Sequence, residues 1–369
     1  MYGLADRAAA ERTAMERALE LALEGWGRVS PNPLVGAVLL KDGRVIGEGG
    51  HAEFGGPHSE VVALSGCDDP RGATCVAGLE PCAHSGKTPP CADALIEAGV
   101  SRVVYAVDDI GEAAGGGAER LKAAGIEVET GLMREEASAL NAQFLWAQRR
   151  PGRPFVALKV ATSLDGLLAD ESGRSQWISG DEARGYVQWL RAGFDSIAVG
   201  RRTVAVDDPQ LTVRGELTPR VPPARIVLSK SGMVHRDLAL VRTAKEVRTI
   251  VVTGSHTVER TAKDLAGSGV EVVAADGLVA VLGKLRELGL ISVLIEGGGS
   301  LAGALLEEHL VDRIYWIQAP LWLGVGVPAF GDRAGLPLED SKRWIVTERR
   351  PLGPDTLLVV DRELCLPES

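Results

Sequence analysis

The chain has 369 residues, more than one hydrophobic core usually serves, so we expect two domains. Hydrophobic residues make up 45% and charged residues 24%, as in globular proteins, and no apolar stretch is long enough to span a bilayer. The formal net charge of -10 argues against nucleic acid or an anionic membrane as a partner. Five cysteines, without a recognisable signal sequence, favour metal binding in the cytoplasm over a disulfide framework.

The first half of the chain alternates between helical and extended patterns. Asp42-Gly43 is a hairpin signal between two of the strands. Strands are expected at residues 34–40, 44–49, 74–79, 102–107 and 126–129, and helices at 12–25, 58–65, 91–98, 117–124 and 132–148. This alternation predicts a sheet covered by helices on both faces, with strand ends and helix starts meeting at one edge.

A linker is expected at Arg149–Pro154, which contains two prolines, one glycine and three arginines. A second α/β pattern follows it. Strands are expected at 155–161, 196–200, 225–228, 249–253, 270–274 and 292–295, helices at 180–192, 258–266, 278–288 and 301–309, and mostly strand and loop at 312–360. We therefore expect one domain at residues 1–148 and another at 154–369.

One histidine, one glutamate and two cysteines occur in an order that suits a zinc-activated water. His58 and Glu60 flank Ser59 at the start of a helix-like run, and Cys82 and Cys91 each follow a proline. Catalytic zinc typically has three protein ligands and an open position for water, whose pKa it lowers while a carboxylate moves the proton. Each residue alone would suit a structural role, but their combination predicts zinc on His58, Cys82 and Cys91 with Glu60 as acid and base. The eight residues between the cysteines are more than the two of common nucleobase deaminases.

A glycine-rich turn is expected in the second half of the chain. Residues 291–308 read as strand, three glycines and helix. Such a turn lets a phosphate approach the backbone and offers it the N–H groups of a helix start. Three glycines alone are weak evidence, because tight turns use glycine for other reasons, and the standard dinucleotide fingerprint is absent.

Both halves of the chain resemble one family, the bifunctional pyrimidine deaminase/reductase of bacterial riboflavin biosynthesis. The first half does so in SPNPLVGAVLLKDGRVIGEG, PHSE and LEPCAHSGKTPPC, and the wide cysteine spacing is a mark of this family. The second half does so in KVATSLDGLLA, SQWIS, DDPQLTVR and EGGGSLAGALL. The resemblance implies a cytidine-deaminase-like three-layer α/β/α domain followed by a dihydrofolate-reductase-like α/β domain.

The resemblance also implies site residues in both halves. In the first half it implies zinc on His58, Cys82 and Cys91 and proton transfer by Glu60. Its substrate contacts would be Asn32, His51, His84, Lys87 and Asp108. In the second half, NADPH contacts would be Ala161, Trp177, Thr203, Asp207, Gly298, Gly299, Ser300, Leu301, Ala302, Gly303 and Ala304. Reductase substrate contacts would be Ser175, Arg191, Leu211, Arg214 and Glu296.

The implied activity covers two consecutive steps of riboflavin synthesis. The first is zinc-dependent hydrolytic deamination of 2,5-diamino-6-ribosylamino-4(3H)-pyrimidinone 5′-phosphate, and the second is reduction of its ribosyl group to ribityl by NADPH. The implied partners are small phosphorylated pyrimidines, with no nucleic acid and no membrane. The resemblance also favours a homodimer or a larger homo-oligomer.

The chain departs from the family pattern in both halves. Ile110 stands where an asparagine is expected, and an isoleucine cannot replace hydrogen bonds whose loss costs about 1–3 kcal/mol. In the second half, Ser229-Lys230 replaces a common Asp-Ser pair, Leu321 replaces a lysine, and Arg201-Arg202 stands where small residues are usual.

Three alternatives stay open from the sequence. One is the same family with one half-reaction impaired. Another is a nucleoside or nucleic-acid deaminase fused to an unrelated NADP-binding domain. The third is a sensor that binds a dinucleotide without turnover.

Overall fold

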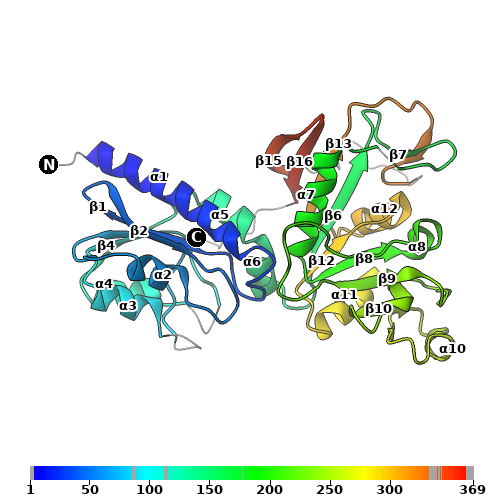
Figure 1. Cartoon of the computed structure of the whole chain (residues 1–369), viewed down its shortest axis with the longest axis horizontal. Helices are drawn as coiled ribbons and strands as arrows, with labels where there is room; N and C mark the ends of the chain where they lie inside the picture. Colours follow the sequence, from blue (N-terminus) through cyan, green and yellow to red (C-terminus); the bar gives the residue numbers. More distant parts are fainter. Residues whose placement is uncertain are drawn as a thin grey trace. The chain divides into compact units, whose positions relative to one another are not determined.

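The structure is a computed structural model that describes residues 4–84, 89–111, 115–176, 178–331, 339, 341 and 343–362. The described chain divides into two compact units, one ending at Arg149 and the other starting at Arg150 (Figure 1). This break lies in the segment rich in proline and arginine. The described helices are all too short or too polar to cross a membrane.

The first unit is built on a five-stranded sheet. Its strands are β1 (Gly36–Lys41), β2 (Arg44–Gly50), β3 (Thr74–Leu79), β4 (Arg102–Val107) and β5 (Glu127–Thr130). In the order β2-β1-β3-β4-β5, β1 is antiparallel to both its neighbours, whereas β3, β4 and β5 are parallel. Asp42 and Gly43 join β1 to β2 with φ of 50° and 72°, the positive values that a tight two-residue hairpin requires.

Helices cover both faces of this sheet. They are α1 (Leu4–Ala22), the 3₁₀ turn η1 (Leu23–Gly25), α2 (Ser59–Ser65), α3 (Cys91–Glu97), α4 (Gly117–Ala123), α5 (Arg134–Leu140) and α6 (Ala142–Arg149). Residues of α2, α3 and α4 pack on one face in a cluster with Leu39 and Tyr105, and Figure 1 shows α1 on the other face. The predicted three-layer α/β/α arrangement is confirmed.

The helix expected at 132–148 is two helices, α5 and α6, which meet at Asn141. The side chain of Asn141 is buried and pairs with the backbone of Leu34, accepting from its N–H (2.8 Å) and donating to its carbonyl (2.9 Å). This pairing ties α5 and α6 to the segment that enters β1. The helix expected from Arg12 starts earlier, at Leu4, because residues 8–10 are alanines, which favour helix strongly.

The second unit contains a nine-stranded sheet. Its strands are β6 (Phe155–Thr162), β8 (Ser196–Gly200), β9 (Ala224–Leu228), β10 (Thr249–Thr253), β11 (Glu271–Ala274), β12 (Ser292–Ile295), β13 (Arg313–Gln318), β15 (Ile345–Leu352) and β16 (Asp355–Asp361). In the order β11-β10-β9-β8-β12-β6-β13-β16-β15, the strands from β11 to β13 are parallel and the last two pairings are antiparallel. A separate antiparallel pair joins β7 (Leu167–Asp170) to β14 (Gly326–Pro328).

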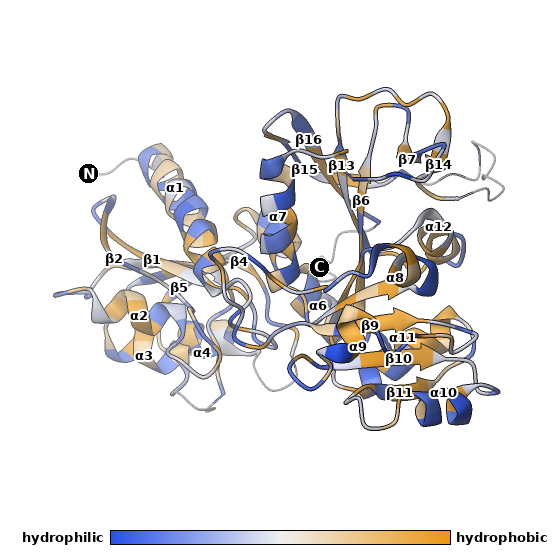
Figure 2. Ribbon diagram, turned by 45° about the vertical axis from the view of Figure 1, so that its right-hand side comes forward, coloured by the Kyte–Doolittle hydropathy of each residue, from blue (hydrophilic) through white to orange (hydrophobic). Residues whose placement is uncertain are grey.

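Helices pack on both faces of the parallel strands. They are α7 (Asp181–Ala192), α8 (Arg201–Asp207), α9 (Ala239–Arg242), α10 (Val258–Asp264), α11 (Leu278–Glu287) and α12 (Gly299–Glu307). Residues of α11 and α12 join one hydrophobic cluster, and residues of α8 and α9 join another. Figure 2 shows the apolar strands β9 and β10 of this sheet. The sequence patterns missed β7, α8 and α9, which have 4, 7 and 4 residues.

The space around Gly36 shows how closely α1 approaches the sheet. A Cβ on Gly36 would lie 2.0 Å from the carbonyl oxygen of Ala18, whereas a Cβ on Gly78 in β3 would make an ordinary 3.5 Å contact with Leu19. We predict that Gly36→Ala lowers the free energy of unfolding by about 1–3 kcal/mol because backbone must move apart. Gly78→Ala is the matched control and should change it much less. Equal effects of the two substitutions in urea denaturation would contradict the observed approach.

Candidate functional sites

Three potential metal ligands lie at the starts of helices and the end of a strand. His58 is the extended residue before α2, Cys91 is the first residue of α3, and Cys82 lies three residues after β3. Two hydrogen bonds from backbone N–H groups hold the cysteine segments together. The N–H of Ala92 donates to the carbonyl of Cys82, and the N–H of Cys91 donates to the sulfur of Cys82 (3.3 Å). The expectation that these ligands meet at one edge is met.

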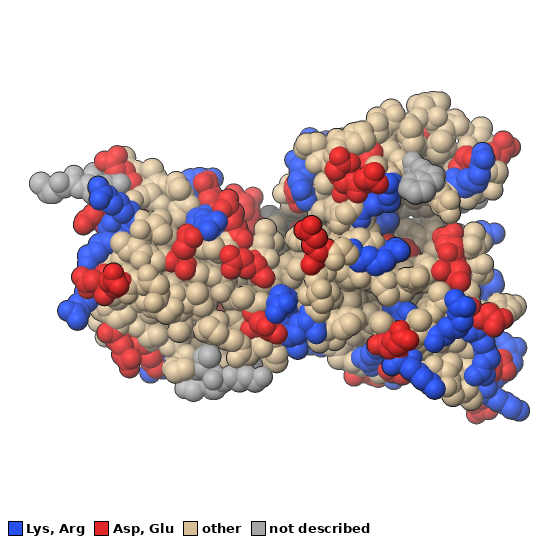
Figure 3. Space-filling view, in the orientation of Figure 1, with Lys and Arg blue, Asp and Glu red and all other residues tan. Residues whose placement is uncertain are grey.

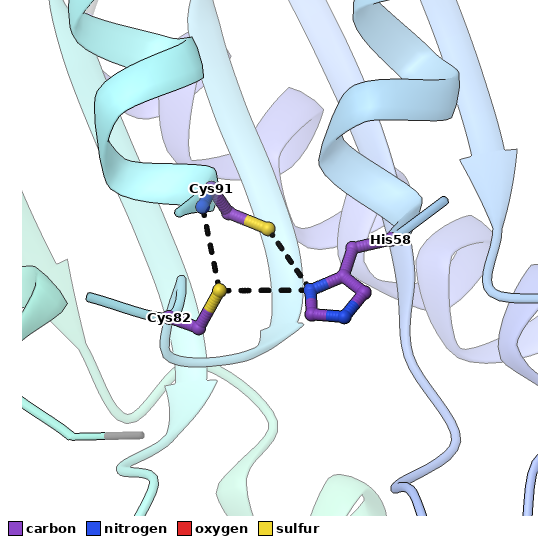
Figure 4. Close-up of side chains that lie close together, drawn as sticks. All are labelled: His58, Cys82 and Cys91. Carbon is purple, nitrogen blue, oxygen red and sulfur yellow. Dashed lines mark hydrogen bonds between the residues drawn. The ribbon is translucent and has the colours of Figure 1, made fainter. Parts of the chain in front are cut away.

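The imidazole of His58 points at both sulfurs (Figure 4). Its Nδ1 lies 3.2 Å from the Sγ of Cys91 and 3.6 Å from the Sγ of Cys82. The three ligand atoms all lie within 4.8 Å of one another. One nitrogen and two sulfur donors, with space for a fourth ligand, suit zinc.

The charges of the two thiols also fit a cation. Hydrogen bonds from the Cys91 thiol and from His58 lower the pKa of Cys82 to about 4. The same hydrogen bond between the cysteines, together with burial, raises the pKa of Cys91 far above its usual range. Without a cation, only one of the two thiols ionises readily. A divalent metal supplies the positive charge that lets both bind as thiolates.

Glu60 lies in the first turn of α2 and is 3% exposed. Burial raises the pKa of its carboxyl group, and the hydroxyl of Ser59 donates to its Oε2 (3.0 Å). A carboxyl group with a raised pKa can both accept and return a proton closer to neutral pH. The residue therefore has the environment that an acid–base group requires.

Glu60, His58 and Cys82 line a cavity of about 290 Å³, and Cys91 does not line it. Asn32 and His51, both predicted from the sequence, line it as well. The Nδ1–H of His51 donates to the carbonyl of Pro57 (2.9 Å), so its Nε2 accepts from the amide of Asn32 (3.1 Å). Burial lowers the pKa of His51, which keeps this ring neutral.

The structure distinguishes between two neighbouring aspartates. Asp109 lines the cavity, and Asp108 does not. The carboxylate of Asp108 instead accepts from Tyr105 (2.8 Å) and pairs with Arg134 (3.0 Å). The substrate contact expected at Asp108 stays a prediction, and it is Asp109, whose pKa burial raises, that borders the cavity.

His84 also lines the cavity, as predicted. Its Nδ1 is buried and, within the part of the chain that the structure describes, has no hydrogen-bond partner. Lys87 lies outside the described residues.

Several lining residues could not be predicted from motifs. Phe144 and Gln148 come from α6, Phe54 comes from the loop after β2, and Glu80 follows β3. The carboxylate of Glu80 accepts from the N–H groups of Asp109 (3.2 Å) and Ala118 (2.9 Å) and so holds the loop that carries Asp109. No local pattern marks Phe54, Phe144 and Gln148, because they reach the cavity only through the packing of distant segments, whereas Glu80 lies within the LEPC motif.

In the second unit, Arg191 and Glu296 form an ion pair. Arg191 in α7 makes two hydrogen bonds (2.6 and 2.9 Å) to Glu296 at the end of β12, and Lys159 in β6 lies 3.9 Å from the same carboxylate. Burial alone would raise the pKa of Glu296, but these two cations outweigh it and lower the pKa. Arg191 also donates to the carbonyl of Thr212, next to the predicted Leu211, which has φ +51°.

The glycine turn after β12 lies against the start of α8. The N–H of Gly298 donates to the hydroxyl of Thr203 (3.2 Å), which brings together two predicted cofactor contacts. Gly299 has a separate packing reason, since a Cβ there would lie 2.4 Å from the carbonyl of Pro328. Ser300 is exposed in the first turn of α12, whereas Ala302 is buried in the core and cannot offer its side chain to a ligand.

The other predicted residues of the second unit are distributed as follows. Ala161 lies in β6, Asp207 ends α8 with its pKa raised by burial, and Arg214 is exposed beside α7, its N–H donating to Gln188. Ser175 is exposed in the loop after β7, and the structure does not join it to the pair of Arg191 and Glu296. Trp177 lies outside the described residues.

Known proteins match this chain over nearly its whole length. Residues 9–107 match the cytidine and deoxycytidylate deaminase zinc-binding region, and residues 154–358 match the RibD C-terminal domain. The riboflavin biosynthesis protein RibD of Escherichia coli is 40% identical over 374 residues, covering 93% of this chain and 97% of that protein. The RibD of Aquifex aeolicus is 38% identical over 356 residues, covering 95% and 98%.

The chain belongs to the RibD family. The crystal structure of a diaminohydroxyphosphoribosylaminopyrimidine deaminase/5-amino-6-(5-phosphoribosylamino)uracil reductase from Thermotoga maritima matches with a TM-score of 0.84 and 35% identity, covering 96% of this chain and 99% of that one. Acinetobacter baumannii RibD matches with a TM-score of 0.82 and 36% identity, again covering 96% and 99%.

Membership of the RibD family excludes one of the three alternatives that the sequence left open. This chain is a bifunctional enzyme of riboflavin biosynthesis, with a deaminase region followed by a reductase domain. A deaminase fused to an unrelated domain is excluded, because the second half matches the RibD reductase domain itself. The predicted family and two-domain α/β fold are confirmed.

The buried pair of Arg191 and Glu296 yields a stability prediction. We expect Arg191→Met to lower the free energy of unfolding by about 3–5 kcal/mol at neutral pH, because it leaves Glu296 as a buried charge. The double variant Arg191→Met/Glu296→Leu should recover most of this loss in urea denaturation. A further loss in the double variant would show that the carboxylate is not the source of the instability.

This instability should depend on pH. The pKa of Glu296 is lowered in the folded protein, so its stabilising contribution is present above the unfolded pKa and is lost as the pH falls. The difference between wild type and Arg191→Met should therefore shrink in acid.

Proposed function

We propose that residues 1–148 deaminate 2,5-diamino-6-ribosylamino-4(3H)-pyrimidinone 5′-phosphate and that residues 154–369 reduce the ribosyl group of the product with NADPH. The observation that carries the first half is the set of His58, Cys82 and Cys91 ligand atoms within 4.8 Å, beside buried Glu60. The name of the Thermotoga maritima relative supports both reactions.

His58, Cys82 and Cys91 would hold zinc, as the type and closeness of their donor atoms indicate. When bound, zinc would lower the pKa of a water molecule and so supply the attacking oxygen. Glu60 takes the proton of that water and returns it to the amino group that leaves as ammonia. Overall, the carbon–nitrogen bond breaks, a carbonyl replaces it, and one water is consumed.

The cavity beside Glu60 supports recognition of a small polar ring. Its described polar groups include the amide of Asn32, held by His51, the free Nδ1 of His84 and the carboxylate of Asp109. Ile110 does not line the cavity, so its presence removes no lining side chain. This observation favours an active deaminase over the alternative in which that half is impaired.

In the second unit, we place the NADPH phosphates at the glycine turn and the substrate near Arg191 and Glu296. NADPH would supply the hydride that reduces the ribosyl group. The N–H groups of Gly299 and Ser300 and the hydroxyl of Thr203, which accepts from Gly298, can donate to phosphate oxygens. Arg214 and Ser175, both exposed, remain proposed contacts to the substrate phosphate.

Replacing Glu60 by glutamine tests the deaminase assignment. We expect Glu60→Gln to keep roughly one zinc per chain and to slow ammonia release by about 10²–10⁴-fold, because glutamine cannot move the proton. The same variant should oxidise NADPH normally when it is given the deaminated intermediate. Metal content, ammonia release and NADPH oxidation are measured separately.

Two controls make this test specific. Cys91→Ser should lose both zinc and deamination while keeping NADPH oxidation, and Cys67→Ser, away from the cavity, should change none of the three. Normal ammonia release by Glu60→Gln would remove Glu60 from the reaction. Absence of NADPH oxidation in the wild type would instead show an impaired reductase.

We also propose a cytoplasmic homodimer or larger homo-oligomer. Large apolar side chains are exposed together around β7 and β14, where the N–H of Leu164 donates to the carbonyl of Leu321. They are Leu164, Leu321, Trp322, Val325 and Val327, and Trp322 is 76% exposed. Exposed apolar groups of this kind mark association surfaces.

Sedimentation velocity tests the association. Trp322→Glu should shift the wild-type oligomer towards the monomer while leaving ammonia release intact, because a charge in an apolar interface is costly. A wild type that is already monomeric at micromolar concentration would contradict the proposal.

A further inference from the structure

A buried arginine of β9 contacts the segment that connects α8 to β9. Figure 3 shows many lysine and arginine side chains of the second unit on the face that it draws, where water solvates their charge. The side chain of Arg225, by contrast, belongs to a residue that is only 1% exposed. Removing a charge from water is costly, so a buried arginine needs partners that replace the water.

Seven hydrogen bonds replace the water around the guanidinium group of Arg225, and all their acceptors are neutral oxygens. Its Nε and Nη2 donate to the hydroxyl of Thr249 (3.0 and 2.7 Å), the register partner of Arg225 on β10. Nη2 also donates to the carbonyls of Leu240, Thr243 and Val247, each at 3.0 Å. These carbonyls lie in α9 and just after it, so the cation caps the carboxyl end of this helix.

One hydrogen bond of Arg225 reaches beyond this cap. Its Nη1 donates to the hydroxyl of Thr243 (2.7 Å) and also to the carbonyl of Gln210 (3.3 Å), in the segment between α8 and β9. The Gln210 carbonyl belongs to the peptide plane on the amino side of Leu211, so its direction sets the φ angle of Leu211. This angle is +51°, in the left-handed region, where a residue other than glycine stays only if its surroundings enforce it.

A second arginine holds the other side of Leu211. Arg191 donates to the carbonyl of Thr212 (3.0 Å) while it pairs with the carboxylate of Glu296. The side chain of Leu211 is buried between these two contacts and joins the hydrophobic cluster that contains Leu240 of α9. Arginines from two different elements therefore fix the carbonyls on both sides of Leu211.

The two ends of this segment are also tied down. The carboxylate of Asp208, whose own φ is +38°, accepts from the N–H of Ala239, the first residue of α9 (2.7 Å). The N–H of Arg214 donates to the side chain of Gln188 in α7 (2.8 Å), and Arg214 stays exposed. A segment that is held in one conformation presents its side chains to a substrate without a further ordering cost.

We propose that Arg225 is a positioning residue of the reductase. Through the Gln210 carbonyl it fixes the backbone at Leu211, and so it holds Leu211 and Arg214 where they meet the ribosyl substrate. Arg225 is itself buried and acts only through this carbonyl. The inference rests on the proposed reductase function of the second unit.

The geometry of the guanidinium group makes the role specific to arginine. Its two Nη atoms lie apart in one rigid plane, so Nη2 can bind the end of α9 while Nη1 binds the Gln210 carbonyl. The single ammonium group of a lysine keeps the charge but cannot reach both places at once.

Arg225→Lys tests the proposal in the full-length enzyme. NADPH oxidation is measured with 5-amino-6-(5-phosphoribosylamino)uracil as the substrate. We expect the KM for this pyrimidine to rise by about 10- to 100-fold, the worth of a lost charged hydrogen bond, while the KM for NADPH stays the same. Ammonia release by the first unit should not change.

Thr243→Val is the matched control. It removes the hydroxyl that shares Nη1 of Arg225 with the Gln210 carbonyl, but it leaves that carbonyl bonded. Both Thr243→Val and Arg225→Lys should lower the midpoint of urea unfolding, because both disturb the same buried cluster. Only Arg225→Lys should change the KM for the pyrimidine, and this difference separates positioning from stability.

A second variant alters the acceptor instead of the arginine. The α-hydroxy analogue of leucine at position 211 converts the amide between Gln210 and Leu211 into an ester, whose carbonyl is a weaker acceptor, and keeps both side chains. We expect the KM for the pyrimidine to rise by about 2- to 10-fold, the worth of one hydrogen bond, with the KM for NADPH unchanged. This variant decides the question if Arg225→Lys does not fold, which loss of NADPH binding in calorimetry would reveal.

The opposite results overturn the inference. An unchanged KM for the pyrimidine in a folded Arg225→Lys, or in the ester variant if the lysine variant does not fold, would show that Arg225 only stabilises the unit. Equal rises in the KM for the pyrimidine and for NADPH would show a general disturbance rather than positioning. A wild type that does not oxidise NADPH would overturn the proposed reductase function itself, and the positioning role with it.

Discussion

The parallel direction of neighbouring strands is the constraint on which both candidate sites depend. In the first unit, β3, β4 and β5 are parallel, so Cys82 and Asp109 follow strands that end at the same edge. In the second, β12 and β8 are parallel, so the glycine turn meets the start of α8. Parallel strands need crossover helices, and the starts of those helices provide His58, Cys91 and the N–H groups of the turn.

Buried charge is the second feature that the two units share. Glu60 is buried beside the hydroxyl of Ser59, the ring of His58 and the two cysteine thiols, and burial raises its pKa, as a proton-transferring group requires. Glu296 is equally buried, yet Arg191 and Lys159 keep its pKa low, so it stays charged. The same side chain thus has opposite properties in the two units, because the neighbouring cations differ.

Sequence patterns predicted most of the fold because most elements are regular. Short, nearly continuous apolar runs located β3, β4, β8, β10 and β12 with their observed bounds, and Asp42-Gly43 correctly marked a hairpin. The expected helix at 132–148 was wrong in one respect, since the pairing of Asn141 with Leu34 joins residues 107 positions apart. The element α8 was missed because Thr203, Val204 and Val206 are β-branched and favour strand over helix.

The sequence by itself determined the chemistry of the site: the donor types at His58, Cys82 and Cys91, the neighbouring Glu60, and the membership of a two-domain family. These are properties of residue type and local spacing, which a linear pattern carries. Only the tertiary structure decided that Asp109 rather than Asp108 lines the cavity, that Phe144 and Gln148 close it, and that Arg191 neutralises Glu296. Those facts depend on which distant segments pack together and on the direction of each side chain, and no local pattern contains either.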